Sequence, residues 1–413
     1  MKNNKLVQKK SVKNMGLLFS GSLTSKLGDI IFDYTNSVWI AGLGANSPKI
    51  MAFYQASQSV MGVLFNLIGG YFSDLSDRKK LLVLTDFFSA LVCFLASFFL
   101  PTPIALYFVL GTNIALAFFY SFNSPAYRAF AREIMVDEHI GRYNSLVSSF
   151  LELAGIIGPA LALVLMEHLS IRQLYWINAA TFLSSAMLEL GITVLFPKKE
   201  TLKKEGFCEV FQGIREGFSY VRKRRELFDI VLLASCSNFF LSGYNLLMPY
   251  TSEITGIKGF YGHALVAGAV GGILGAFLMN KADYKKMKLG FKMALNLGMT
   301  GVAMIFFFVS RNLFETEFFY LVPLFILGMF ITMFNISVMT SVQLSVESEF
   351  LGRVFSIMFT VSLLFMPVGS AFFSYVFDVY RILNFLILGL GIVSLSVMYF
   401  GKQYIRQRKI EKH

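Results

Sequence analysis

Long apolar runs alternate with short polar connections along nearly the whole chain. Twelve such runs stand at about residues 15–43, 49–72, 81–100, 103–126, 143–167, 173–196, 228–251, 258–280, 288–310, 318–341, 353–376 and 381–401. Each has roughly the 20 residues that a helix needs to cross the hydrocarbon core of a bilayer. The runs are too long, and too rich in Leu and Phe, for the two-residue alternation of a membrane β-barrel. The pattern therefore predicts an all-α membrane protein with twelve transmembrane helices.

Composition and charge agree with a membrane setting. Of the 413 residues, 55% are hydrophobic and 15% are charged, whereas soluble domains carry about 25% charged residues. Lys and Arg gather in both tails and in every second connection. Because basic loops stay in the cytoplasm, we expect both termini there, in the plasma (inner) membrane of a bacterium. The net charge of +12 follows from this topology, and its spread over separate loops argues against a nucleic-acid partner.

The chain divides into two halves of six predicted helices each. Residues 1–196 are expected to form an N-terminal six-helix bundle and residues 228–413 a C-terminal six-helix bundle. Residues 197–227 between them carry the densest charge of the chain and form a predicted cytoplasmic linker with an amphipathic helix. A surface helix that joins two domains is the simplest interpretation of this linker.

The two halves are related in sequence. The segment Gly69–Lys80 can be aligned with Gly275–Lys286, and Gly141-Arg142 with Gly352-Arg353, at offsets close to half the chain. Two pseudo-symmetric bundles imply a central cavity at their interface, which opens to either side as the bundles rock.

The connection between the second and third predicted helices carries the most informative motif, Gly69-Gly-Tyr-Phe-Ser-Asp-Leu-Ser-Asp-Arg-Lys-Lys80. Its acids can sit at helix N-termini and its bases can pair with acids, so that a tight hairpin holds two helices together at the membrane surface. The motif resembles the signature loop of the major facilitator superfamily. It matches that loop at Gly70, Ser73, Asp74, Arg78 and Lys79, and has Asp77 where glycine is usual. The resemblance implies a gating role for these residues.

Two further acids stand near the predicted cytoplasmic ends of their helices. Asp86 lies just inside the third predicted helix and Glu189 near the end of the sixth. Both are shallow enough along the sequence to reach lipid headgroups or loop bases. We therefore expect Asp86 to join Asp74 and Arg78 in a latch.

The first predicted helix carries an unusual row of polar residues. Lys26, Asp29, Asp33 and Asn36 follow at spacings of three, four and three, which puts them on one helical face. Ionised groups deep in a membrane should face a watery cavity or one another. Asp33, and next to it Asp29, are therefore candidates to bind a proton or a cationic substrate, although Lys26 could instead receive an anion. The alternative is a structural Lys26–Asp29 pair that only fixes helix packing.

The fifth predicted helix holds Glu152, followed by Gly155-Ile-Ile-Gly158-Pro159. This stretch resembles, in shortened form, the Gly-rich segment ending in Gly-Pro of drug/proton antiporters. Small residues allow close helix approach, and Pro159 permits bending, so Gly158 and Pro159 are expected to take part in gating. The resemblance implies antiport. Glu152 is then either a second protonation site or a hydrogen-bonded structural acid.

The fourth predicted helix departs from the superfamily pattern, because Thr112 and Asn113 stand where an arginine linked with proton coupling is frequent. Further along, Asn123-Ser-Pro-Ala126 and Gly141–Leu146 resemble the macrolide-efflux branch of the superfamily. In this superfamily the first, fourth, seventh and tenth helices line the cavity. Their polar or aromatic candidates here are Lys26, Asn36, Trp39, Asn113, Tyr120, Asn238, Tyr244, Asn245 and Asn335. His263, early in the eighth helix, is expected to bond a neighbouring helix.

Together these patterns predict a secondary active transporter that exports lipophilic or amphipathic small molecules by alternating access, in exchange for protons. Export of one endogenous solute (a metallophore, lipid or peptide) and solute import stay open as alternatives. A membrane enzyme or a sensor is disfavoured, because the sequence shows no catalytic His/Asp/Glu cluster and no signalling domain. No Gly-x4-Gly-Lys-Ser/Thr loop points to ATP, and no ligand spacing points to a metal or another cofactor. The expected partners are a small-molecule substrate, protons and the lipid bilayer, and we expect a monomer.

Overall fold

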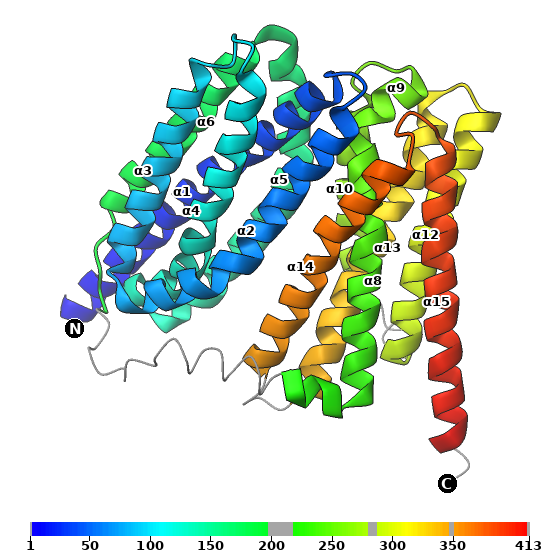
Figure 1. Cartoon of the computed structure of the whole chain (residues 1–413). Helices are drawn as coiled ribbons and strands as arrows, with labels where there is room; N and C mark the ends of the chain where they lie inside the picture. The colour runs from blue at the N-terminus through cyan, green and yellow to red at the C-terminus, as the bar shows by residue number, and fades with distance from the viewer. Residues whose placement is uncertain (1, 197–217, 280–286, 347–350, 411–413) are drawn as a thin grey trace. The chain divides into compact units, whose positions relative to one another are not determined.

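The computed structural model describes residues 2–196, 218–279, 287–346 and 351–410, and all regular structure in these ranges is helical (Figure 1). The ranges contain twelve long helices of 19 to 40 residues. These are α1 (Lys2–Ala41), α2 (Ser47–Leu75), α3 (Arg78–Ser97), α4 (Ala105–Ile134), α5 (Asp137–His168), α6 (Ile171–Leu190), α8 (Arg225–Leu247), α10 (Phe260–Leu278), α12 (Leu289–Leu313), α13 (Glu317–Ser345), α14 (Leu351–Val376) and α15 (Leu383–Ile410). The short helices η1 (Met248–Tyr250) and α9 (Thr251–Thr255) follow α8. The predicted all-α fold is confirmed, while most of the predicted linker helix lies outside the described residues.

Seven of the described helices are long and apolar enough to cross a membrane by length and composition alone. They are α3, α4, α8 with its extension to Thr255, α10, α12, α13 and α15. Shorter apolar stretches, Leu153–His168 and Thr360–Val376, lie within α5 and α14. Helix α1 is 40 residues long, but it is less apolar than these helices because polar and charged residues interrupt its apolar part. The helix that is least like a membrane span in composition is thus the one that carries the predicted functional row.

Helix α1 starts well before its apolar part, and buried polar contacts explain why. The Asn14 side chain is 1% exposed; its Nδ2 donates to the carbonyl oxygens of Ile134 (2.9 Å) and Thr193 (2.7 Å). Ser11 Oγ accepts a hydrogen bond from the backbone N–H of Val136 at 3.0 Å. These contacts tie the basic N-terminal segment, which we expected only as a tail, to the ends of α4 and α6 and to the start of α5.

The chain forms two compact units, which are described one by one. The first comprises residues 1–40 and 57–205. Within it α3 packs along α6 and α4, and an apolar cluster that includes Leu18, Leu82 and Phe130 joins α1, α3 and α4. Helices α2 and α4 approach so closely that a Cβ atom on Gly69 would lie 2.1 Å from the Ser121 carbonyl oxygen.

The second unit comprises residues 41–56 and 206–413. Helix α10 packs along α13, α12 lies against α13 and α15, and α14 packs along α8. A Cβ atom on Gly275 would lie 2.4 Å from the Met329 carbonyl oxygen, so α10 and α13 touch backbone to backbone. The sequence comparison aligned Gly69 with Gly275. Both glycines therefore serve the same purpose, each in its own unit.

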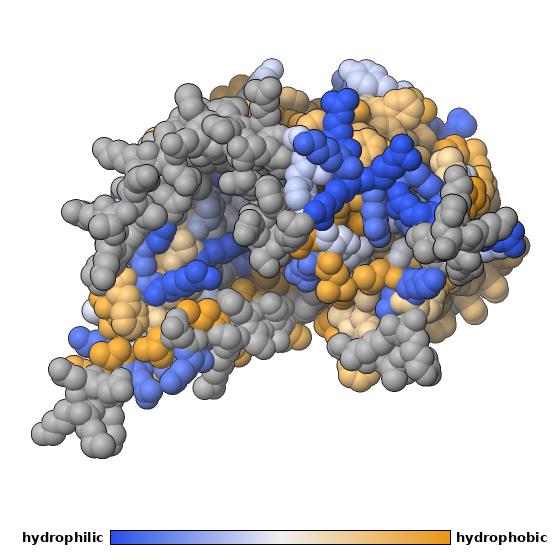
Figure 2. Space-filling view, turned by 90° about the horizontal axis from the view of Figure 1, so that it is seen from below, coloured by the Kyte–Doolittle hydropathy of each residue, from blue (hydrophilic) through white to orange (hydrophobic). Residues whose placement is uncertain are grey.

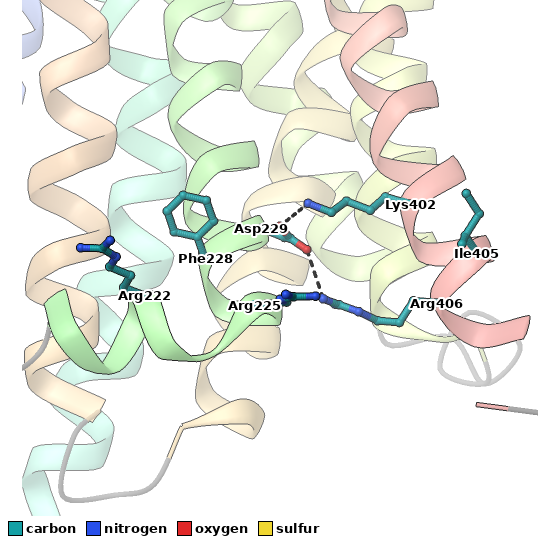
Figure 3. Close-up of a pocket in the computed structure, with 7 residues that line it drawn as sticks. All are labelled: Arg222, Arg225, Phe228, Asp229, Lys402, Ile405 and Arg406. Atoms are coloured by element: carbon teal, nitrogen blue, oxygen red, sulfur yellow. Dashed lines mark hydrogen bonds and ion pairs between the residues drawn. The ribbon is translucent and has the colours of Figure 1, made fainter. Parts of the chain in front are cut away.

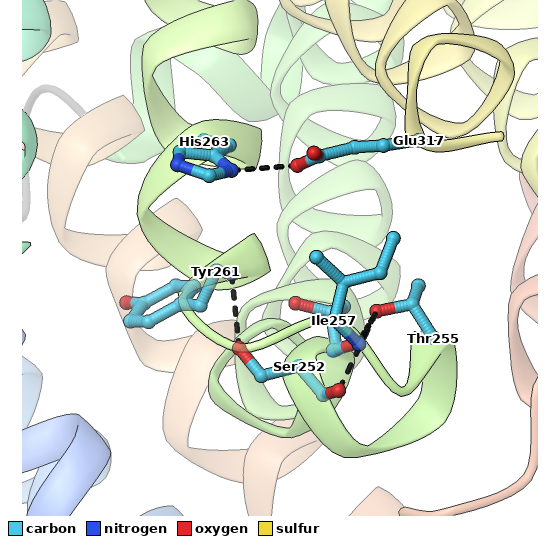
Figure 4. A network of polar contacts seen from close by, with 7 residues as sticks. Ser252, Thr255, Ile257, Tyr261, His263 and Glu317 are labelled. Atoms are coloured by element: carbon cyan, nitrogen blue, oxygen red, sulfur yellow. Dashed lines mark hydrogen bonds and ion pairs between the residues drawn. The ribbon is translucent and has the colours of Figure 1, made fainter.

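A polar network closes the junction of α9 and α10 (Figure 4). The Tyr261 backbone N–H donates to Ser252 Oγ at 3.1 Å, and the Ile257 N–H donates to Thr255 Oγ1 at 3.4 Å. His263 Nδ1 lies 2.6 Å from Glu317 Oε1, which joins the first turn of α10 to the first turn of α13. The expectation that His263 bonds a neighbouring helix agrees with this contact.

Candidate functional site in the first unit

The polar row of α1 lies inside the first unit. Lys26, Asp29 and Asp33 are half-buried, and the Asn36 side chain is fully buried, where its Oδ1 accepts a hydrogen bond from the Tyr175 hydroxyl of α6 at 3.1 Å. Lys26 Nζ lies 5.8 Å from the centre of the Tyr120 ring on α4. The row thus joins α1 to α4 at one end and to α6 at the other.

A hydrogen-bonded chain connects Asp33 to two further helices. Gln58 Nε2, on α2, donates to Asp33 Oδ1 at 3.0 Å and to Asn113 Oδ1 of α4 at 2.8 Å. Asn113 Nδ2 in turn donates to Ser57 Oγ of α2 at 2.9 Å. A carboxylate among membrane helices needs such donors, because lipid provides none. The chain makes Asp33 the point at which α1, α2 and α4 meet.

Asp86 on α3 and Glu189 on α6 form a second acidic group. Their exposed fractions are 6% and 2%. Asn123 Nδ2 donates to Asp86 Oδ1 at 3.0 Å, whereas Glu189 Oε2 is buried and has no hydrogen-bond partner among the described residues. The expectation that both acids reach headgroups or loop bases is wrong, because their side chains belong to the packed faces of α3 and α6.

The α2–α3 connection ties the ends of several helices together. Asp77 is the N-cap of α3, where it accepts from the Lys80 backbone N–H. Arg78 forms an ion pair with Glu133 at the end of α4. Lys79 Nζ donates to carbonyl oxygens at the end of α6, those of Leu190 (2.7 Å) and Ile192 (2.8 Å). Among the described contacts, this connection joins α3 to α4 and α6.

Some predicted gating and coupling residues lie partly outside the described part of the chain. The surroundings of Gly70 and the side chains of Asp74 and Glu152 lie outside the described part of the structure. Gly158 and Pro159 are buried in α5. A Cβ atom on Gly158 would lie 2.4 Å from Ile30 Cγ2, so this glycine allows α5 to pack against α1.

The remaining cavity candidates differ in their surroundings. Trp39 is half-buried, while Tyr120, Asn245 and Asn335 are exposed within their own units. Asn238 Nδ2 donates to the Ser362 carbonyl oxygen at 3.2 Å and so joins α8 to α14. The Tyr244 ring packs edge-on against Phe385 of α15. The central cavity between the bundles stays a prediction.

Three residues of the site were missed or misplaced from the sequence. Gln58 is one of three side-chain amides on α2, with Gln55 and Asn66, and Glu133 stands beside a basic residue in the sequence. Glu189 was placed at the membrane surface. Each owes its position to contacts with residues 50 or more positions away, which spacing within one helix does not show.

Long apolar helices with ionisable groups held inside a helical unit are typical of a polytopic membrane protein. The family model of the Major Facilitator Superfamily matches residues 18–370. The chain belongs to the Major Facilitator Superfamily, and it is a multi-pass membrane protein and secondary transporter rather than an enzyme.

Named relatives and solved structures agree with this assignment. Macrolide efflux protein A of Enterococcus faecalis is 24% identical over 326 residues, which cover 76% of this chain and 98% of that protein. Macrolide efflux protein A of Streptococcus pyogenes is 23% identical over 309 residues, or 73% of this chain and 74% of that protein. A crystal structure of the nucleoside transporter NupG superposes with a TM-score of 0.73 at 14% identity, covering 94% of this chain and 99% of that one. The peptide transporter POT in complex with sulfate superposes with a TM-score of 0.70 at 14% identity, covering 94% of both chains.

Proposed function

We propose that the chain exports lipophilic or amphipathic small molecules in exchange for protons, with Asp33 as the principal proton-binding group. The observation that carries this proposal is the hydrogen-bonded chain from Asp33 through Gln58 to Asn113. It places a carboxylate where three membrane helices meet, so that a change in its charge reaches all three.

Protonation of Asp33 would alter this junction in a defined way. Hydrogen bonds to an ionised acceptor are roughly twice as strong as neutral ones. The same Gln58 nitrogen donates to Asp33 and to Asn113. When Asp33 takes a proton, its bond to Gln58 weakens and the shared N–H groups favour Asn113. Proton binding thus weakens the hydrogen bond that joins α1 to α2. This change biases an equilibrium between two helix arrangements.

Two neighbouring groups support this assignment. Asp29 lies within electrostatic range of Lys26, Asp33 and Asp86, so a proton on one acid changes the field at the others. Glu189 Oε2 is buried without a partner among the described residues, and an ionised carboxylate is costly in such a place. Glu189 is therefore a second group that would hold a proton in the first unit.

The substrate class rests on different grounds. The relatives that cover most of this chain are named for macrolide efflux, and bacterial relatives favour the cell membrane. The Tyr120 side chain is exposed within its unit and lies beside Lys26, so it offers an aromatic face to a lipophilic ligand. Export, antiport and cytoplasmic termini are part of the same proposal.

The test is efflux of ethidium and of the macrolide erythromycin from energised vesicles, with and without a protonophore. We expect Asp33→Asn to abolish protonophore-sensitive efflux while substrate exchange without a proton gradient continues. Asp29→Asn and Glu189→Gln are expected to weaken the coupling. Glu167→Gln, which removes an acid from the exposed end of α5, is the matched control and should behave as wild type.

Two results would overturn the proposal. Full protonophore-sensitive efflux by Asp33→Asn would remove Asp33 from the coupling mechanism. No efflux of either compound by folded wild-type protein would refute multidrug export and favour a dedicated solute.

A further inference from the structure

A pocket of about 530 Å³ lies in the second unit, between the start of α8 and the end of α15 (Figure 3). Its lining combines four cationic side chains, one carboxylate and two large apolar side chains. These residues are Arg222, Arg225, Phe228, Asp229, Lys402, Ile405 and Arg406. The proposed transport mechanism uses none of them.

The single carboxylate is already shared by two of the cations. Asp229 is 5% exposed, and its Oδ1 lies 2.5 Å from Lys402 Nζ while its Oδ2 lies 3.3 Å from Arg406 Nη2. Figure 3 shows both side chains reaching from α15 toward Asp229. Arg222 and Arg225 are exposed and add two positive charges to the lining. The pocket therefore carries a surplus of three positive charges, four from Lys and Arg against one from Asp229.

The pocket also has two exposed apolar side chains in its lining. Phe228 is 45% exposed and Ile405 is 59% exposed, and both lie in helices that are apolar enough to cross a membrane. Figure 2 views the end of the molecule at which α8 begins and α15 finishes, where hydrophilic residues gather with hydrophobic residues among and beside them. A ligand here would meet the cations along the pocket and one exposed apolar side chain toward each end, Phe228 at one and Ile405 at the other (Figure 3).

We propose that this pocket binds the phosphate group of an anionic phospholipid. Guanidinium groups pair with phosphate oxygens through two parallel hydrogen bonds, and Arg222 and Arg225 are the cations to which this role falls. The acyl chains would lie along Phe228 and Ile405. Basic pockets between membrane helices on the cytoplasmic side bind anionic headgroups. The basic segments next to this pocket, before α8 and at the end of α15, are among those that we expect in the cytoplasm. A soluble phosphate ion shares the headgroup chemistry but gains nothing from the apolar side chains.

Native mass spectrometry of the full-length protein, released from phosphatidylcholine nanodiscs with and without phosphatidylglycerol, tests this proposal. We expect wild type to retain phosphatidylglycerol, and Arg222→Gln and Arg225→Gln each to weaken its binding by about fivefold, the effect of one basic residue near an anionic surface. Arg408→Gln is the matched control. It makes the same charge change on α15, where Arg408 stacks over Tyr404 outside the pocket, and should bind as wild type.

Inorganic phosphate, added to both samples, separates the two possible sources of the anion, because its own binding is read without phosphatidylglycerol and its competition with the lipid is read with it. Phosphate that fails to displace phosphatidylglycerol supports the lipid site. Phosphate that binds with the same dependence on Arg222 and Arg225, and displaces the lipid, would overturn it in favour of a soluble anion. Equal retention of phosphatidylglycerol by wild type and a folded Arg222→Gln/Arg225→Gln double variant would refute the pocket altogether.

Discussion

Asp229 holds two cations at once, and this sharing predicts a non-additive effect on stability. Each of its carboxylate oxygens faces one cation, Lys402 or Arg406. In Lys402→Gln or Arg406→Gln alone, the other cation still balances the buried carboxylate. In the double variant neither does, so the cost of the double variant should exceed the sum of the single ones.

The magnitudes follow from burial. The side chains of Lys402 and Arg406 are 58% and 30% exposed, and ion pairs near solvent contribute about 0–1 kcal/mol, so each single variant should cost up to about 1 kcal/mol. Leaving a buried charge without its partner costs about 3–5 kcal/mol. We take about 3 kcal/mol for the double variant, the lower end of that range, because Arg222 and Arg225 line the same pocket. At about 2–4 °C per kcal/mol, single variants lose at most about 2–4 °C of melting temperature and the double variant loses about 6–12 °C.

A fluorogenic thiol dye can follow this unfolding in the right part of the molecule. Cys236 is half-buried in α8, so in a Cys93→Ala, Cys208→Ala background its labelling reports the second unit. The measurement is made in neutral detergent without anionic lipid. Adding Asp229→Asn to the double variant removes the uncompensated charge, and we expect it to restore about half of the lost melting temperature.

Two outcomes would contradict the reasoning. If the double variant loses no more than the sum of the single variants, the two cations act independently and Asp229 is not shared. If Asp229→Asn makes the double variant less stable still, the buried charge is not what destabilises it.

Three further predictions concern other contacts. Gln58→Leu removes the amide that joins α1, α2 and α4, and should slow proton-coupled efflux without loss of folded protein, measured by transport per folded molecule. Gly275→Ala forces α10 away from α13 and should cost about 1–3 kcal/mol of stability by overpacking. Gly401→Ala, in the same unit and with nothing within 4 Å of its Cβ, should cost no stability in the same thermal assay. His263→Ala breaks the contact with Glu317, and because both side chains are more than a third exposed it should cost less than about 1 kcal/mol while raising amide hydrogen exchange in the first turn of α10.

The helices were predictable from the sequence because a chain that crosses lipid must satisfy its backbone hydrogen bonds internally. An apolar run of about twenty residues has no other stable structure in a bilayer, so runs such as 318–341 correspond directly to helices such as α13 (317–345). The early start of α1 was not predictable, because Asn14 finds its partners at the distant ends of α4 and α6 and Ser11 finds its partner at the start of α5. Local pattern contains no information about such partners.

The candidate site was predictable only along single helices. The spacing of Lys26, Asp29 and Asp33 placed them on one face of α1, and the structure brings that face against α2 and α4 through Gln58. Depth along the sequence misplaced Asp86 and Glu189, because distance from a helix end says nothing about which side of the helix faces its neighbours. Rotation of a helix about its axis is set by tertiary packing.

The matched glycines of the two units bear on how the chain has changed over its history. Gly69 and Gly275 each face a backbone carbonyl of a neighbouring helix, and a main chain cannot step aside as a flexible side chain can. If the halves descend from one duplicated ancestor, these positions tolerate almost no substitution, whereas the charged positions beside them are free to drift, as Asp74 and Asn280 have done. Glycines at close helix contacts would then stay the same in both halves for longer than charged residues do. Internal duplication in such chains is therefore better detected by matching glycine positions than by matching charged positions.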